Sequence, residues 1–69
     1  MINNYVITGM TCGHCVNHVT EEVIALDGVE AVDVVLEGGT MAVTSEAEVD
    51  FDTITEAVAE AGDYTVVKA

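Results

Sequence analysis

The 69-residue sequence has no proline and no tryptophan, and it has almost no basic residues. One Lys or Arg stands against 13 Asp and Glu, which gives a formal net charge of −12 at pH 7. Nucleic acids and anionic membranes both need basic partners, so both are excluded as targets. The charge predicts a solvated, repulsive surface. Two more specific interpretations of the charge are docking onto a basic partner and adaptation to a salty interior. The sequence does not distinguish between them.

A leader segment and a long apolar run are also missing. The first residues, Met1-Ile2-Asn3-Asn4, include no basic residue, and no long apolar run follows. The sequence therefore shows no signal peptide and no membrane span. A chain of this length predicts one small domain, residues 1–69, with a modest core and little material for a deep cleft. We expect a binding module rather than an enzyme.

Cysteine occurs only twice, as Cys12 and Cys15. Two cysteines three residues apart cannot link distant segments, so they do not form a disulfide framework. With no export signal, we expect a reducing cytoplasm, where such a pair indicates metal binding or redox chemistry.

The remaining sequence alternates between strand-like and helix-like segments. Residues 2–8 are rich in β-branched and aromatic side chains, which is typical of a strand. Apolar residues recur at helical spacing in residues 15–26 and again from Phe51 to Ala61. Further strands are expected at residues 29–36, 41–45 and 64–67.

Glycine and aspartate mark the expected ends of these segments. Gly28 is expected to stop the first helix and Gly62 the second. Asp50 or Asp52 can cap the second helix at its start. Gly38-Gly39 is a hairpin signal between the second and third strands.

The order strand, helix, strand, strand, helix, strand predicts an α+β fold. The simplest packing is a ferredoxin-like βαββαβ sandwich, with a four-stranded antiparallel sheet and two helices on one face. We expect Val32, Val34 and Leu36 to share one face of their strand. Val6 and Val35 are expected on the open face of the sheet.

The segment Gly9-Met10-Thr11-Cys12-Gly13-His14-Cys15 leaves a strand and enters a helix. Unpaired N–H groups and the positive end of the helix dipole favour thiolate over thiol, most directly for Cys15 in the first turn. A thiolate pair suits soft Cu(I), which accepts low coordination. It does not complete a structural zinc site, which normally takes four ligands.

This loop resembles the metal-binding loop of the heavy-metal-associated domain family, which includes small bacterial copper chaperones and the N-terminal domains of copper-transporting P-type ATPases. The resemblance covers nearly the whole chain, including the Glu60-Ala61-Gly62 end of the second helix. It implies a Cu(I) ion held between Cys12 and Cys15 and passed on by ligand exchange. It further implies a copper-transporting P-type ATPase as the partner, and a chain that is monomeric without metal, with a metal-bridged dimer as a further option.

Several residues near the loop have two interpretations. Met10 is either a soft ligand or, as the family suggests, an apolar plug beneath the loop. Thr11 is expected to cap the helix. His14 and His18 fall on the side of the helix opposite Val19, so we expect exposed polar residues. The sharper hypothesis gives His14 a role in a metal-bridged dimer or a transfer intermediate.

Asp63 and Tyr64 mark a departure from the family pattern. Bacterial copper chaperones of the family typically carry Tyr directly after the Gly that ends the second helix, and here Asp63 intervenes between Gly62 and Tyr64. Either residue could occupy the place beside the metal, or Tyr64 could be a simple strand residue. A nearby Asp63 carboxylate would admit Zn(II).

Three functions therefore remain on the sequence alone. The first is a cytoplasmic chaperone that carries Cu(I), with Zn(II) or another soft heavy metal as the alternative cargo. The second is a thiol–disulfide redox protein that uses the same two cysteines. The absence of proline counts against this second function, because a thioredoxin-like domain needs a cis-Pro loop. The third is a structural domain with incidental cysteines. A start at Met1 and an end soon after the last strand favour a free chaperone over an excised ATPase domain.

Overall fold

The computed structural model describes all residues, 1–69, and contains the predicted order of elements. A short 3-10 turn, η1, separates the second and third strands. The elements are β1 (Ile2–Thr8), α1 (Gly13–Ile24), β2 (Val29–Val35), η1 (Glu37–Gly39), β3 (Thr40–Ser45), α2 (Phe51–Ala61) and β4 (Thr65–Lys68).

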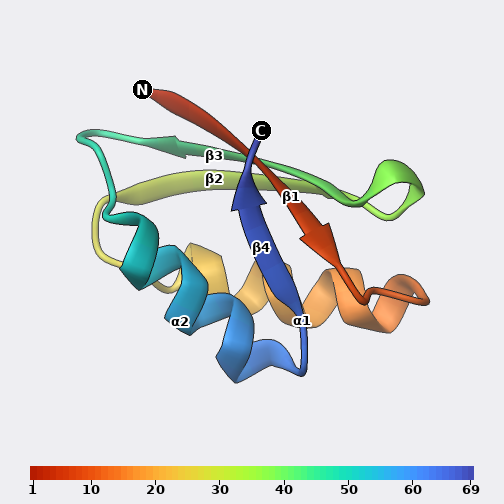
Figure 1. Cartoon of the computed structure of the whole chain (residues 1–69). Coiled ribbons are helices and arrows are strands. Elements are labelled where there is room, and N and C mark those ends of the chain that lie inside the picture. Colours follow the sequence, from red (N-terminus) through yellow and green to blue (C-terminus); the bar gives the residue numbers. More distant parts are fainter.

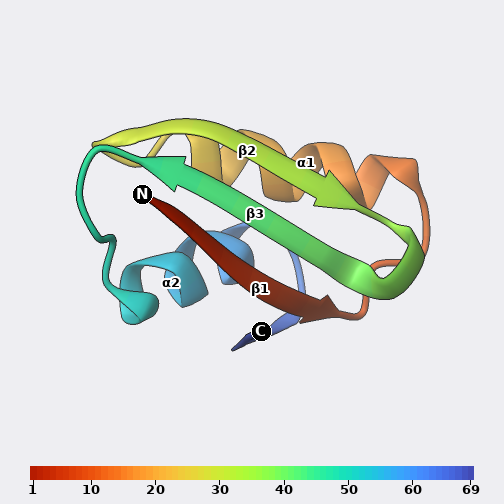
Figure 2. The ribbon, with the colours of Figure 1, turned by 90° about the horizontal axis from the view of Figure 1, so that it is seen from above.

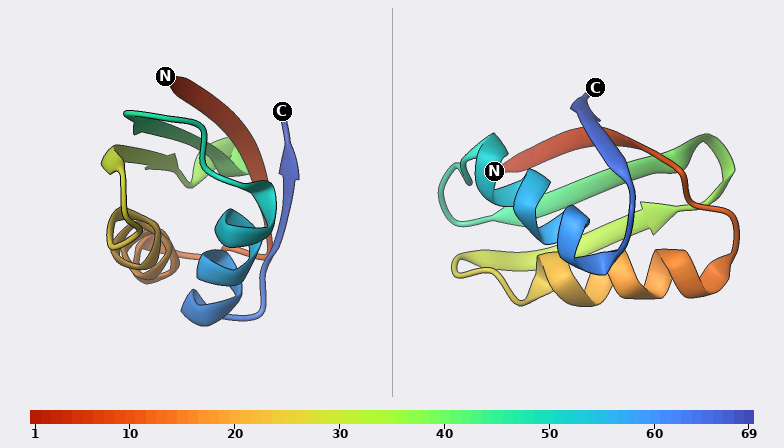
Figure 3. Two further views of the ribbon diagram at one scale, coloured as in Figure 1. Left: turned by 90° about the vertical axis from the view of Figure 1, so that its left-hand side faces the viewer. Right: turned by 60° about the horizontal axis from the view of Figure 1, so that its bottom comes forward.

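The four strands form one antiparallel sheet in the order β2-β3-β1-β4. Both helices lie against the same face of this sheet, and the other face is bare (Figure 1; end view in Figure 3). Seen from above, β2 runs over α1, and α2 lies on the β1 side of the sheet (Figure 2). The predicted ferredoxin-like sandwich is confirmed.

The core fills the space between the sheet and the helices. Its strand residues alternate along β1, β3 and β4, and its helix residues follow the three-and-four spacing read from the sequence. The buried apolar side chains are Tyr5, Ile7, Val19, Val23, Met41, Val43, Ile54, Ala57, Val58 and Val66. A layer of half-buried apolar residues, among them Met10 and Tyr64, packs around this cluster. The core therefore extends to the end of the molecule where the cysteine loop lies.

The end of α1 differs from the prediction. The helix stops at Ile24 with Ala25 as its C-cap, so the expected extension to residue 26 is wrong. Gly28, with φ of +86°, lies in the turn that leads to β2 and does not terminate the helix. Two hydrogen bonds form this turn, from Leu26 N–H to the Val23 carbonyl and from Val29 N–H to the Leu26 carbonyl. Leu26 still packs against the core, which is why it fits the helical pattern in the sequence.

The second strand ends one residue early. Val32 and Val34 pack against the core as expected, but Leu36 takes helical angles at the start of η1 and is 41% exposed. The expectation that Leu36 shares their face is therefore wrong. Val35 is 44% exposed and Val6 is half-buried on the open face, as predicted.

The β2–β3 connection uses both glycines of the predicted hairpin signal. Gly38 and Gly39 have φ of +82° and +66°. A side chain at Gly39 would collide with the carbonyl oxygen of Ile7, because this turn packs against the end of β1. Glycine is required here for both reasons.

The second helix begins and ends where the sequence predicts. Asp50 occupies the N-cap position, but its side chain makes no capping hydrogen bond. Gly62 is the C-cap. Neither helix has the length and apolar character that crossing a membrane requires.

Candidate metal centre

The two cysteines lie at one end of the molecule, where β1 gives way to α1. Cys12 is the N-cap of α1 with extended backbone angles, and Cys15 lies in the first turn. The carbonyl of Cys12 accepts the N–H of Cys15 at 3.1 Å and that of Val16 at 3.4 Å, which fixes the turn. The two Sγ atoms are 3.8 Å apart. Cys12 is exposed and Cys15 is half-buried, so one sulfur is open to solvent and the other is supported by the fold.

Hydrogen bonds lower the pKa of the Cys15 thiol to about 6. The largest contribution is the backbone N–H of Thr11, and the second is the hydroxyl of Tyr64. Partial burial opposes them, while the Cys12 N–H and the Thr11 hydroxyl, 3.9 Å away, add to them. Each donor stabilises the charged sulfur more than the neutral thiol. Cys15 is therefore mostly thiolate at neutral pH, which is the form that binds soft metals.

Tyr64 reaches this site from the start of β4. Because its hydroxyl donates to the Cys15 sulfur, the pKa of Tyr64 is raised; its burial and the nearby sulfurs act in the same direction. Its ring lies against two glycines. A Cβ at Gly62 would stand 2.7 Å from the ring and one at Gly9 3.2 Å from it, and Gly9 also has φ of +108°. Glycine at both positions allows the ring to approach the cysteine loop.

Tyr64 and Asp63, the two residues considered for the place beside the loop, differ in position. Tyr64 contacts Cys15, whereas Asp63 is exposed. No third His, Cys, Asp or Glu joins the sulfurs in a cluster that could hold a metal. His14 and His18 are both exposed on α1, as predicted. The sequence signal for Tyr64 is weak, because its role depends on packing against Cys15, which lies 49 positions earlier in the chain.

The expected roles of the two remaining loop residues have different outcomes. Met10 is half-buried and packs against the core, as the plug interpretation predicts. Thr11 does not cap α1, because Cys12 occupies the N-cap position and no side chain makes a capping bond. The backbone N–H and hydroxyl of Thr11 instead point to Cys15. Thr11 therefore supports the sulfur and not the helix.

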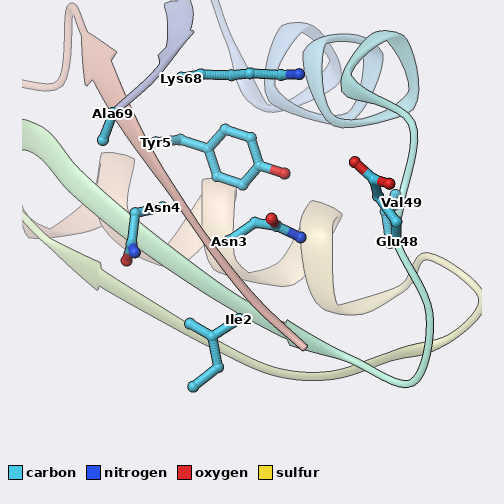
Figure 4. A pocket seen from close by; sticks show the side chains of 8 residues that line it. All are labelled: Ile2, Asn3, Asn4, Tyr5, Glu48, Val49, Lys68 and Ala69. Carbon is cyan, nitrogen blue, oxygen red and sulfur yellow. The ribbon is translucent and has the colours of Figure 1, made fainter.

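A cavity of about 250 Å³ lies away from the cysteines. It opens between the start of β1 and the chain before α2, and its lining residues include Asn3, Tyr5, Glu48 and Lys68 (Figure 4). The pKa of Tyr5 is raised by burial and by the charge of Glu48. Lys68 Nζ lies 5.4 Å from the centre of the Phe51 ring. No cysteine lines this cavity, so the candidate metal site is the exposed loop that carries Cys12 and Cys15.

Comparison with known sequences identifies the family. The sequence model of the heavy-metal-associated domain matches residues 5–63, which include both cysteines and both helices. The chain therefore belongs to the heavy-metal-associated domain family.

Among its relatives is the copper chaperone CopZ of Bacillus subtilis, which is 43% identical over 63 residues and 90% of each chain. A solved CopZ metallochaperone superposes with a TM-score of 0.87 at 32% identity, covering 97% of this chain and 100% of that one. The yeast copper transporter domain Ccc2a, solved in apo and Cu(I)-loaded states, gives a TM-score of 0.82 at 31% identity over 97% and 94% of the two chains. The fold is that of copper chaperones and copper-transporter domains.

Proposed function

We propose that this protein is a cytoplasmic, non-enzymatic metallochaperone that binds Cu(I) through Cys12 and Cys15. The observation that carries the proposal is the pair of sulfurs 3.8 Å apart on an exposed loop, with the Cys15 thiol already acidic. A metal–sulfur bond of about 2.3 Å, the length known for zinc, allows one ion to contact both atoms. Two soft ligands without a third protein ligand suit Cu(I) better than Zn(II), which seeks four.

The exposed position of the two sulfurs also allows delivery of the Cu(I) ion to a partner. A cysteine pair of the partner reaches the ion at the exposed loop, forms a three-coordinate intermediate and displaces the two protein sulfurs in turn. Hydrogen bonds from Thr11 and Tyr64 stabilise the Cys15 thiolate once the ion has gone. They make it a better leaving group, because a less basic thiolate leaves more readily. The account needs no catalytic residue.

The partner we propose is the metal-binding domain of a copper-transporting P-type ATPase. Relatives of the fold support this assignment, since one neighbour is the yeast copper transporter domain. A groove between α1 and α2 is lined by His18, Glu21, Glu22, Glu60 and Ala61. Its three carboxylates, on a chain of net charge −12, favour a partner surface that carries Lys or Arg.

A transfer experiment tests this function. Cu(I)-loaded protein is mixed anaerobically with a purified ATPase metal-binding domain, and copper is measured on each after separation. We expect copper on the domain, and a rate that falls as NaCl rises. Replacement of Glu21, Glu22 and Glu60 by Gln is expected to slow transfer without changing copper affinity. Retention of copper by the chaperone refutes delivery, and a rate independent of salt refutes the charged docking surface.

A further inference from the structure

The cavity beside the start of β1 brings together polar side chains that the metal site does not use. Lys68, the chain's only Lys or Arg residue, reaches the cavity from β4, and Glu48 reaches it from the chain before α2 (Figure 4). Asn3 and Tyr5 line it from β1. The cysteine loop follows the opposite end of β1, so an occupant of the cavity leaves both cysteines free.

The Tyr5 hydroxyl is a polar group that the fold leaves without a partner. Tyr5 is only 3% exposed, and its hydroxyl takes part in none of the side-chain hydrogen bonds of the protein. Because no fully buried polar side-chain atom lacks a partner, this hydroxyl opens into the cavity that Tyr5 lines. Figure 4 shows it pointing toward Glu48. Burial and the charge of Glu48 raise the pKa of Tyr5, so the hydroxyl stays protonated and able to donate.

The two charged groups of the cavity are also unpaired. The side chains of Lys68 and Glu48 take part in no hydrogen bond, with each other or with any other group. Lys68 Nζ instead lies 5.4 Å from the centre of the Phe51 ring, and that ring stacks on Tyr5 with centroids 6.2 Å apart. The aromatic contact holds the ammonium at the wall of the cavity. One positive and one negative group are therefore free to bind a ligand.

We propose that this cavity binds a small zwitterion of the α-amino acid class. The ligand carboxylate accepts hydrogen bonds from Lys68 and from the Tyr5 hydroxyl, and the ligand ammonium donates to Glu48. A simple anion would meet the Glu48 carboxylate in a chain whose net charge is already −12. A simple cation would be repelled by Lys68. A molecule that carries both charges satisfies both groups.

The size and lining of the cavity limit the ligand further. Its volume of about 250 Å³ lies below the range of about 300–1,000 Å³ that is usual for drug-sized ligands, so the ligand is on the scale of one amino acid. Val49 supplies an apolar wall, which suits an aliphatic side chain. The amide of Asn3 adds a second neutral polar group beside Tyr5. L-Leucine fits these requirements and serves as the probe.

An NMR titration of the reduced, metal-free protein tests the proposal. L-Leucine is added at about pH 7, where it is a zwitterion. We expect saturable amide shifts at the residues that line the cavity, Asn3, Tyr5 and Glu48 among them, with a Kd of about 1 mM or below. Two analogues each keep one of the charges: 4-methylpentanoate lacks the amine, and 3-methylbutylamine lacks the carboxylate. Both are expected to bind at least about tenfold more weakly than L-leucine.

Variants assign the charges to their residues. Lys68→Gln and Glu48→Gln are each expected to weaken L-leucine binding at least about tenfold. Tyr5→Phe removes only the hydroxyl and is expected to weaken it at least about threefold. Glu46→Gln removes an exposed carboxylate of the same segment that does not line the cavity, and its affinity is expected to be unchanged. The amide spectrum of each variant establishes that it is folded.

Four results would overturn the proposal. The first is the absence of saturable shifts with up to about 20 mM L-leucine. The second is equal binding of L-leucine and either analogue, which would make the cavity a site for a single charge. The third is unchanged affinity in Lys68→Gln or in Glu48→Gln, or an equal loss in Glu46→Gln. The fourth is a set of shifts centred on the cysteine loop and not on the cavity.

Discussion

The net charge of −12 makes a strong prediction about stability in salt. The radius of gyration, 10.5 Å, corresponds to a sphere of about 14 Å radius, whereas the unfolded chain has a radius of gyration of about 25 Å. Screened repulsion then opposes folding by about 7 kcal/mol at about 0.1 M ionic strength and by about 3 kcal/mol at about 1 M. We expect NaCl to stabilise the fold by about 4 kcal/mol over this range, which raises Tm by about 15 °C or more.

Urea unfolding of the reduced, metal-free protein, followed by circular dichroism, measures this gain, because urea adds no charge. A charge-reduced control separates screening from the general strengthening of apolar burial by salt. Glu21→Lys, Asp27→Lys and Glu56→Lys together replace three negative charges by three positive charges at exposed positions, which changes the net charge from −12 to −6. Because repulsion scales with the square of the charge, the gain in this variant is expected to fall to about 1 kcal/mol. An equal gain in both proteins would refute the reasoning.

Three further predictions concern single residues. Tyr64→Phe removes one donor to the Cys15 thiolate, so the midpoint of its alkylation rate against pH is expected to rise above about 6; an unchanged midpoint would exclude this hydrogen bond. The native pKa of Cys15 lies below its ordinary value of 9.0, so the free energy of unfolding of the metal-free protein is expected to rise from pH 6 to pH 9. This contribution is lost as the pH falls through about 6, and Cys15→Ser should abolish it. Ile54 is fully buried in the core, and Ile54→Ala is expected to cost about 2–5 kcal/mol in urea unfolding, while a cost below about 1 kcal/mol would contradict the packing described.

Most of the fold could be predicted from the sequence where local pattern decides it. The β-branched run at Ile2–Thr8 and the spacing that ends at Gly62 matched the observed β1 and α2. The predicted ends of α1 and β2 were wrong, because a residue of the following turn continues the apolar spacing of the helix or strand. Leu26 keeps helical spacing because it packs on the core, although α1 has already ended at Ile24. Leu36 continues the alternation of β2 but begins η1.

The candidate site, like the fold, could be predicted from the sequence only in part. Cys12 and Cys15 are visible in the sequence because one loop contains both. Tyr64 could be named but not placed, because its position near Cys15 depends on the pairing of β4 with β1, which brings the residue before β4 to the cysteine loop. Thr11 was assigned to the helix because threonine favours N-caps, whereas in the structure Cys12 takes that position. The N-cap preference of threonine is a local rule. It could not predict that the N–H and hydroxyl of Thr11 would interact with the Cys15 sulfur.

Copper binding by the two cysteines is the central claim, and an anaerobic titration tests it most directly. Fully reduced protein is titrated with Cu(I) in competition with a chromogenic chelator, with Zn(II) in parallel and with Cys12→Ser/Cys15→Ser as the control. The account predicts one Cu(I) per chain bound more tightly than by the chelator, weak Zn(II) binding and no binding in the control. Zn(II) that competes on equal terms, or copper retained by the double variant, would contradict the assignment of the cysteine pair as a Cu(I) site.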